Sequence, residues 1–222
     1  MGHNNLFAPR RPAVHHVRHS GASQPLMNED RVVRDVIVMG GSAGGIEVLI
    51  RVLADLPADL PALVCIVVHR PPGQSQLAEV LGQRSRIAVV EASRRLKLTR
   101  SRVYIAPPDH HLELGRDHML IRRSPKEHSA RPAIDPLFRS AAQVYGPRVA
   151  GILLSGGGDD GVNGLILIKQ NGGIPLIQDP AEAQIPFLPL SAVRYDHPEC
   201  LVRSDAIAST LIALVQGEAV KC

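Results

Sequence analysis

Short apolar runs alternate with segments of helical periodicity along most of the chain. The runs at residues 36–39, 63–68 and 149–154 contain no alternating polar positions, which is typical of strands buried on both faces of a parallel sheet. A similar run at residues 174–177 predicts a fourth buried strand. Elsewhere, apolar residues recur three and four positions apart, which predicts amphipathic helices. The expected helices lie at residues 46–53, 77–81, 137–145, 162–169 and 207–215.

The middle of the chain has a different pattern. Short apolar runs at residues 103–105, 111–114 and 119–121 are separated by the turn-forming sequences Pro-Pro-Asp and Gly-Arg-Asp. These runs predict an antiparallel, hairpin-like excursion from the parallel sheet. Together the elements predict a single three-layer α/β/α domain with a mostly parallel sheet, and we place it at residues 33–222.

The first 32 residues lack sustained apolar periodicity and are rich in His, Arg, Pro, Asn and Ser, so we expect residues 1–32 to be a disordered basic tail. Most of the net charge of +4 belongs to residues 1–34, which hold five arginines and two acidic residues. The domain itself is therefore close to neutral. Its aromatic content of 3% also leaves few rings for base stacking, so we expect no nucleic-acid partner.

The three cysteines have no CxxC spacing, and Cys65 lies within an apolar run. We therefore expect Cys65 in the core, no disulfide framework and a cytoplasmic location. No apolar run reaches membrane-spanning length and the N-terminus lacks a signal-like apolar segment, so we expect no membrane insertion. The pair His110–His111 lacks the spacing of a structural zinc site, so no metal is expected.

Three of the expected strands end at chemically distinctive residues. Ser42 follows the first run within Gly40–Gly45, which matches the G-x-S-x-G nucleophile elbow between a strand and a helix. His69 directly follows the second run, and Asp160 lies in the glycine-rich turn after the third. Because the carboxyl ends of parallel strands meet at one sheet edge, the three residues predict a nucleophile, a general base and an orienting carboxylate.

Each of these residues also has a structural interpretation. The elbow could be a tight packing turn, although it lacks the P-loop lysine and the G-x-G-x-x-G spacing of a phosphate-binding loop. His69 could anchor a loop. Asp160 could cap a helix, and Asp159 is a competing carboxylate. Arg131, just before an expected helix, could bind a substrate carboxylate or serve in packing and capping. The glycines at 156–158 could present N–H groups to an oxyanion.

The chain resembles the bacterial chemotaxis protein-glutamate methylesterases, the CheB family, from about residue 34 to its end. Five separated motifs carry the resemblance in the family's order: residues 36–45, Val68-His69-Arg70-Pro71-Pro72-Gly73, Val103-Tyr104-Ile105-Ala106-Pro107-Pro108, Arg131-Pro132-Ala133-Ile134-Asp135 and residues 153–161.

The resemblance implies a mostly parallel α/β fold and hydrolysis of γ-glutamyl methyl esters on the cytoplasmic helices of methyl-accepting chemoreceptors. It also implies deamidation of receptor glutamines, without a cofactor. It places the nucleophile at Ser42, the base at His69 and the carboxylate at Asp160, because the family's aspartate immediately precedes the glycine that starts the helix.

The sequence departs from the family's pattern in several places. The family has an N-terminal receiver domain, and the 32-residue tail is too short for one, so we expect no control by phosphorylation within this chain. Gly157 stands where the family has a Met thought to help form the oxyanion hole, and Ala43 stands where Thr is common. Residues 186–190 replace a more polar, Met-Pro-containing segment.

We expect oxyanion or substrate contacts at Ala43, Gly156, Gly157 and Arg131. Two other functions remain open on the sequence alone. One is a non-catalytic module that docks on receptors, and the other is an esterase for a different protein or small ester, because fold and catalytic machinery do not name the acyl group.

Overall fold

The structure is a computed structural model, and it describes residues 31–94, 96–196 and 200–220. The described residues belong to one compact unit that begins at Arg31. The tail predicted at residues 1–32 lies almost wholly outside the described residues.

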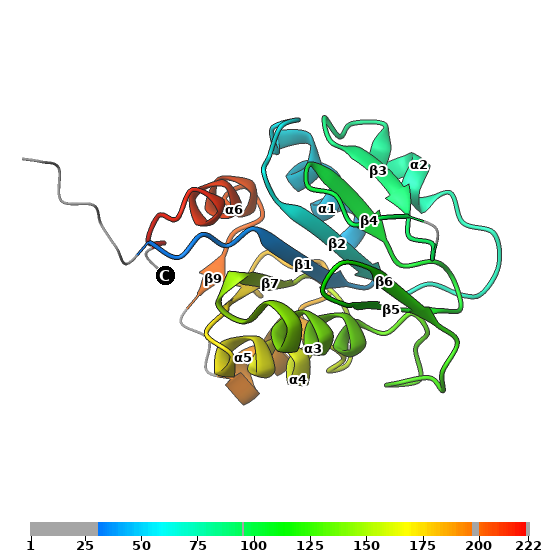
Figure 1. The fold of residues 1–222 in the computed structure, drawn as a ribbon. Coiled ribbons are helices and arrows are strands. Elements are labelled where there is room, and N and C mark those ends of the chain that lie inside the picture. Colours follow the sequence, from blue (N-terminus) through cyan, green and yellow to red (C-terminus); the bar gives the residue numbers. More distant parts are fainter. Residues whose placement is uncertain (1–30, 95, 197–199, 221–222) are drawn as a thin grey trace, which may run out of the picture. The chain divides into compact units, whose positions relative to one another are not determined.

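A seven-stranded sheet runs through the middle of this unit (Figure 1). Its strands lie in the order β3-β4-β2-β1-β7-β8-β9, and every neighbouring pair is parallel. Every residue of the three central strands is buried, which explains why their apolar runs carry no polar alternation. The strands are β1 (Val36–Gly41), β2 (Leu63–Val68), β3 (Ala88–Glu91), β4 (Arg102–Ile105), β7 (Val149–Leu153), β8 (Ile174–Gln178) and β9 (Leu201–Val202).

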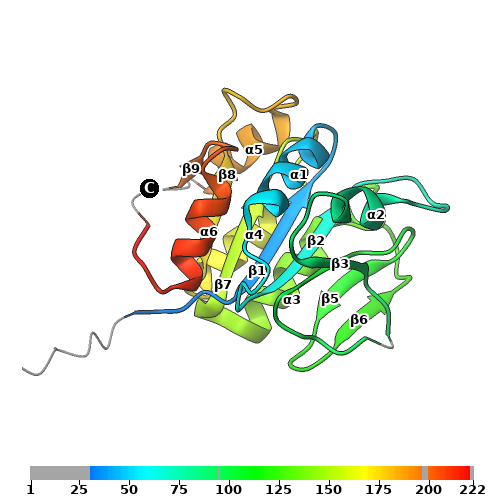
Figure 2. The same cartoon turned by 90° about the horizontal axis from the view of Figure 1, so that it is seen from above.

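Helices cover both faces of the sheet, as Figures 1 and 2 show. One face packs against α1 (Gly45–Asp55), α2 (Leu77–Gly82) and α6 (Ile207–Val215). The other packs against α3 (Ile134–Tyr145), α4 (Val162–Gln170) and α5 (Phe187–Asp196). A separate apolar core lies on each side of the sheet, so the predicted three-layer α/β/α class is confirmed.

The antiparallel excursion is smaller than the sequence pattern predicted. It consists of β5 (His111–Leu114) and β6 (Met119–Arg122), which pair antiparallel outside the main sheet. The placement of residues 103–105 in this hairpin is wrong. They belong to β4, which is parallel to both β2 and β3 and buries Val103, Tyr104 and Ile105 in the sheet.

Two strands and one α-helix have no counterpart among the elements predicted from the sequence. Strand β3 has only partly buried and exposed residues, and β9 has only two residues, so neither forms a recognisable apolar run. Helix α5 contains Pro189 in its first turn, where a missing N–H is tolerated, and the sequence analysis predicted no element there.

The thiols follow the sequence expectation only in part. Cys65 is a free, fully buried thiol in β2, and burial raises its pKa. Cys200 is disulfide-bonded, which the expectation of no disulfide framework did not include. None of the helices in the described part of the chain combines the length and apolar character needed to cross a bilayer.

The strand order reverses at β1, with β2 and then β4 on one side and β7 and then β8 on the other. Ligand sites in open α/β sheets form at the carboxyl ends of the strands beside such a switch point. The fold therefore predicts that a ligand site lies at the segments that follow β1, β2 and β7.

Candidate active site

Ser42 lies in the sharp turn between β1 and α1. Its N–H donates to the carbonyl oxygen of Ser155 at 2.9 Å, and its own carbonyl accepts from the N–H of Gly45 at 3.0 Å. Gly44 has a left-handed backbone with φ of 79°, and a Cβ at Gly44 would lie 2.6 Å from Ser155 Oγ. The turn therefore requires glycine. It leaves the half-buried Ser42 at the N-terminus of α1, where developing negative charge is stabilised.

His69 occupies the corresponding position after the neighbouring strand. Gly41 and Val68 are register partners at the ends of β1 and β2, and the N–H of His69 donates to the Gly41 carbonyl at 3.1 Å. Ser42 and His69 are thus the next residues beyond two strands that lie about 5 Å apart. Among the described residues, no hydrogen bond joins the Ser42 hydroxyl to the His69 ring. Such bonds are often completed only when substrate binds.

Asp160 holds the His69 ring. Its Oδ2 lies 2.6 Å from His69 Nε2, and its side chain is only 2% exposed. The same carboxylate accepts from the N–H groups of Ile134 at 2.7 Å and Asp135 at 3.0 Å, at the start of α3. Helix capping was the structural alternative for Asp160. The residue does cap a helix, but the helix is α3, and the cap leaves it able to orient the imidazole.

These contacts set the role of each imidazole nitrogen. An ionised carboxylate only accepts hydrogen bonds, so Nε2 of His69 carries the ring proton and Nδ1 is left as the acceptor. The competing Asp159 is 62% exposed and lies 3.0 Å from Nδ1 of His128 instead. The geometry therefore favours Asp160 over Asp159 as the partner of His69.

The residues expected to bind the oxyanion differ in whether their backbone N–H groups already have an acceptor in the protein. Gly156 lies against the nucleophile, since a Cβ there would be 2.9 Å from the Cβ of Ser42, but its N–H already donates to the Ile185 carbonyl at 2.9 Å. Gly157 faces open space, with nothing within 4 Å of an added Cβ. In the described part of the chain, the N–H groups of Ala43 and Gly157 have no protein acceptor, so both are available to an oxyanion.

Arg131 is held by protein acceptors. Its Nε and Nη2 donate to Asp109 Oδ1 at 2.8 and 2.6 Å, and its Nη1 donates to the Ser124 carbonyl at 2.6 Å. The hydrogen bond from Arg131 lowers the pKa of Asp109, and Arg123 adds to this effect. The network fixes the segment before α3, and a substrate contact by Arg131 stays a prediction.

The carboxyl edge that carries His69 also carries an open groove of about 790 Å³. It is lined largely by polar residues from the ends of β2, β3 and β4 and the loops after them: Gly73, Gln74, Ser75, Gln76, Glu91, Pro107, Pro108 and His110. A large ligand therefore has access to this edge without being enclosed.

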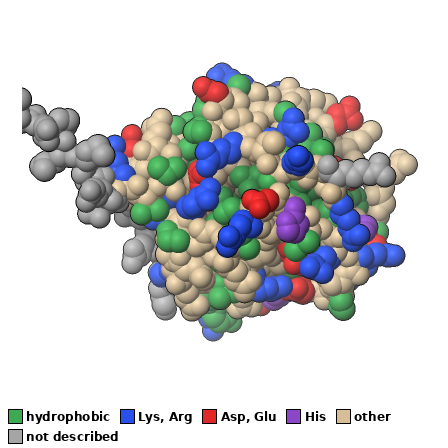
Figure 3. All heavy atoms as spheres, viewed as in Figure 1, with side chains coloured by type: hydrophobic (Ala, Val, Ile, Leu, Met, Phe, Trp, Pro, Cys, Tyr) green, Lys and Arg blue, Asp and Glu red, His purple; other side chains and the backbone are tan. Residues whose placement is uncertain are grey.

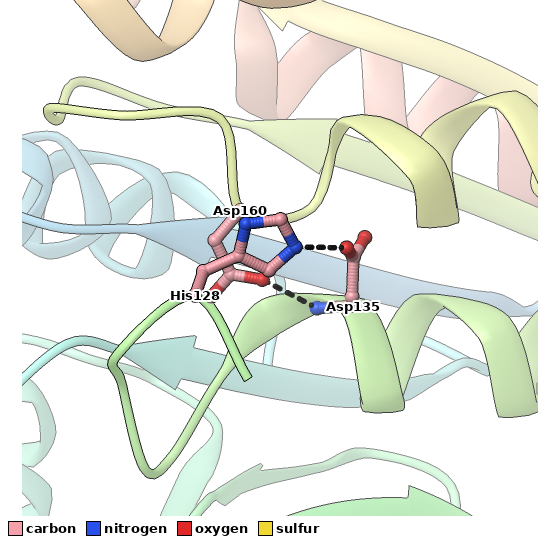
Figure 4. A group of neighbouring side chains, drawn as sticks. All are labelled: His128, Asp135 and Asp160. Atoms are coloured by element: carbon pink, nitrogen blue, oxygen red, sulfur yellow. Dashed lines mark hydrogen bonds and ion pairs between the residues drawn. The ribbon is translucent and has the colours of Figure 1, made fainter. Parts of the chain in front are cut away.

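A second histidine lies beside the triad carboxylate, and the sequence reasoning missed it. His128 is close to Asp135 and Asp160, with one nitrogen or oxygen atom of each within 4.8 Å of the others (Figure 4). Asp135 belongs to one of the sequence motifs, but no spacing in the sequence connects it with His128 and Asp160.

The fold and these contacts place the chain in a class of proteins: α/β proteins with the side chains of a serine hydrolase at the carboxyl edge of the sheet. The family model described as CheB methylesterase matches residues 37–211. The chain therefore belongs to the CheB methylesterase family.

The individual relatives agree with this assignment. The protein-glutamate methylesterase/protein-glutamine glutaminase 2 of Methanosarcina mazei is 34% identical over 199 residues, which are 86% of this chain and 54% of the relative. The protein-glutamate methylesterase/protein-glutamine glutaminase 2 of Anaeromyxobacter dehalogenans is 39% identical over 183 residues, 82% of this chain and 54% of the relative. The chain spans about half the length of these two relatives.

Two further proteins match over nearly their full length. A putative protein-glutamate methylesterase/protein-glutamine glutaminase of Leptospira interrogans is 33% identical over 185 residues, which are 82% of this chain and 96% of that protein. The crystal structure of the Thermotoga maritima CheB methylesterase catalytic domain superposes with a TM-score of 0.79 at 31% identity. The match covers 83% of this chain and all of that one.

Proposed function

We propose that this chain is a serine hydrolase that removes methyl esters from glutamate side chains on the cytoplasmic helices of chemoreceptors. The observation that carries the proposal is the 2.6 Å contact between His69 and Asp160, with Ser42 at the end of the adjacent strand. The names of the relatives supply the substrate class. They also include glutaminase activity, which the same acyl transfer would perform on a side-chain amide.

The reaction uses each side chain in a defined role. Nδ1 of His69 takes the Ser42 hydroxyl proton as the serine oxygen attacks the γ-carbonyl carbon of the ester. The imidazolium then returns this proton to the departing methoxide, and methanol leaves. A water molecule, deprotonated by His69, hydrolyses the glutamyl-serine ester and restores Ser42. Asp160 keeps the ring in the required tautomer and stabilises its charged form.

Charge that develops on the carbonyl oxygen needs nearby donors. The N–H groups of Ala43 and Gly157 are the candidates, with the N-terminus of α1 behind Ser42. Because donation comes from the backbone, it does not depend on the Met that the family carries in place of Gly157.

An open carboxyl edge supports a polypeptide substrate. The groove after β2, β3 and β4 is not enclosed, whereas pockets for small ligands bury most of the ligand's surface. On the face seen in Figure 3, Lys and Arg side chains are spread over the surface with fewer Asp and Glu side chains among them.

The direct experiment measures methanol release from methylated receptor by the wild-type chain and by Ser42→Ala, His69→Ala and Ser209→Ala. We expect the first two variants to lose about 10⁴-fold or more in kcat, because nucleophile and base act as a unit. Ser209→Ala removes an exposed hydroxyl from α6 and should leave the rate unchanged.

The outcomes separate the alternatives. Receptor binding without methanol release by the wild-type chain would indicate a docking module. Hydrolysis of small esters with no release from methylated receptor would indicate a different acyl substrate. Full activity in Ser42→Ala would show that the nucleophile is assigned wrongly.

A further inference from the structure

His128 lies between two carboxylates at the edge of the site. Its Nε2 is 3.0 Å from Asp135 Oδ2, and its Nδ1 is 3.0 Å from Asp159 Oδ1 (Figure 4 shows the contact with Asp135). A neutral imidazole has one N–H and can donate to only one of them. Two ionised carboxylates, one on each nitrogen, are satisfied together only by the doubly protonated imidazolium.

One of the two carboxylates is connected directly to the triad. The Asp135 side chain is 3% exposed, and its Oδ1 accepts from the N–H of Gly164 in α4 at 2.7 Å. The backbone N–H of the same residue donates to Asp160 Oδ1. His128 therefore contacts the side chain of Asp135, and the backbone of Asp135 donates to the triad carboxylate of Asp160.

The other carboxylate is the chain neighbour of Asp160. Asp159 lies in the glycine-rich turn after β7, and within the described part of the chain its side chain contacts only the ring of His128. The His128 imidazole thus contacts two segments: the start of α3, which donates to Asp160, and the turn before α4, which carries Asp160.

The loop that carries His128 has an unfavourable backbone. His128 and Ser129 have φ of 47° and 61°, in the left-handed region that non-glycine residues rarely adopt. The backbones of Glu127 and Ala130 form a bridge across this turn, and Glu127 pairs with Arg139 of α3. The loop conformation therefore persists because its side chains are bonded to α3 and to the glycine-rich turn.

A bound metal ion is the alternative occupant of this cluster. The oxygens of Asp160 and Asp135 already accept hydrogen bonds from the N–H groups of Ile134, Asp135 and Gly164. The positive ends of these N–H dipoles would repel a metal cation bound to the same carboxylates. The cation that this geometry accommodates is the imidazolium itself.

We propose that His128 is a positioning residue that, as an imidazolium bonded to both Asp135 and Asp159, fixes the Asp160 carboxylate against His69. This inference rests on the triad of the proposed function. The carboxylates that act on the ring are Asp135 from α3 and Asp159 and Asp160 from the turn. Lys126 and Glu127 are the other charged residues of its own loop, and Arg139 of α3 pairs with Glu127. The carboxylates outweigh the effect of partial burial and raise the pKa of His128 above its ordinary value.

The protonation state can be measured without turnover. In ¹⁵N-labelled full-length Ser42→Ala protein, we expect the His128 ring to titrate above pH 6.5 and to show two protonated nitrogens at pH 6.5. Asp135→Asn should lower this pKa, because the cation loses its buried counter-charge. A neutral, singly protonated His128 at pH 6.5 would overturn the proposal.

The positioning role is tested with His128→Gln, Asp159→Ala and the matched control Lys126→Gln. Lys126 is an exposed residue on the same loop, so its substitution removes one positive charge without removing a carboxylate contact. With a small ester, we expect His128→Gln to lower kcat about tenfold with little change in KM, and to lose the decline of kcat at alkaline pH. Asp159→Ala, an exposed substitution compatible with folding, should give a smaller loss, and Lys126→Gln none.

A second readout follows the contact that His128 is proposed to fix. The short His69–Asp160 hydrogen bond should give a downfield proton resonance, which we expect to weaken in His128→Gln and to persist in Lys126→Gln. Unchanged kcat and an unchanged resonance in His128→Gln would overturn the proposal. So would stoichiometric binding of Zn²⁺ that shifts the His128 resonances and alters the rate, because the cluster would then be a metal site.

Failure of the proposed function gives a different result. If the wild-type chain hydrolyses no ester, the triad mechanism fails, while the titration and the downfield resonance still decide whether His128 positions Asp160.

Discussion

At the residue scale, the site depends on close backbone approaches and on how each imidazole nitrogen is used. Gly156 lies so near Ser42 that no side chain fits between them, and Gly44 adopts a left-handed backbone before α1. His69 has one nitrogen on Asp160 and one left for the nucleophile, whereas His128 has both nitrogens on carboxylates. The first histidine is therefore suited to proton transfer and the second to positioning.

The two adjacent glycines of the turn after β7 offer a matched pair of substitutions. Gly156→Ala would place a Cβ 2.9 Å from Ser42 Cβ and 3.1 Å from Leu188 Cδ2, so we expect a loss of about 100-fold in kcat as the nucleophile shifts. Gly157→Ala meets nothing within 4 Å and should keep nearly full activity. Steady-state kinetics with a small ester measures both, and equal losses in the two variants would contradict the packing around Ser42.

At the element scale, the strand ends could be predicted from the sequence and the connecting loops could not. Ser42, His69 and Asp160 each follow a buried apolar run, so chain order alone indicates that they meet at one edge. His128 contacts residues 7 and 31 positions away through a loop with left-handed backbone, and no periodicity encodes such contacts. The placement of residues 103–105 in the hairpin was wrong because a three-residue apolar run fits a hairpin as well as a strand of the sheet.

The contacts of His128 with Asp135 of α3 and Asp159 of the glycine-rich turn predict that the free energy of unfolding depends on pH. Burial lowers the pKa of His128, but Asp160, Asp135 and Asp159 outweigh it, so the folded-state pKa lies above the ordinary value near 6.5. A raised pKa of a cationic group stabilises the fold fully below the unfolded pKa, and this contribution is lost as pH rises through the folded pKa.

Urea unfolding from pH 6 to pH 9 measures this contribution. The difference in unfolding free energy between the wild-type chain and His128→Gln should be largest at pH 6 and shrink toward pH 9. Lys126→Gln serves as the control, with a small difference that varies little with pH. If the difference in unfolding free energy between the wild-type chain and His128→Gln is equal at pH 6 and pH 9, the proposed ion pairs of the His128 imidazolium with Asp135 and Asp159 would be contradicted.

At the scale of the whole molecule, two apolar cores on opposite sides of one parallel sheet hold the site at the sheet's carboxyl edge. The predicted class followed from the alternation of apolar runs and helical segments. The domain boundary near residue 33 stays a prediction from the change in composition, and the family model matches from residue 37. What bulk composition did not reveal is the disulfide at Cys200, because bonding depends on a contact in space.

The domain boundary gives a prediction at this scale. A chain of residues 31–222 keeps both cores and every residue proposed for the site, so we expect a melting temperature within about 3 °C of that of the full chain. Its kcat for a small ester should be unchanged. Differential scanning calorimetry and steady-state kinetics check this, and loss of cooperative unfolding in the shortened chain would show that residues 1–30 belong to the folded domain.

The central claim is that Ser42 is a nucleophile activated by His69. Its most direct test is covalent labelling with a fluorophosphonate, followed by peptide mass spectrometry of the wild-type chain, Ser42→Ala and His69→Ala. We predict one adduct on the peptide that contains Ser42, no adduct in Ser42→Ala, and labelling slowed by at least about 100-fold in His69→Ala. An adduct on another residue, or labelling of Ser42 at the wild-type rate in His69→Ala, would contradict the proposed site.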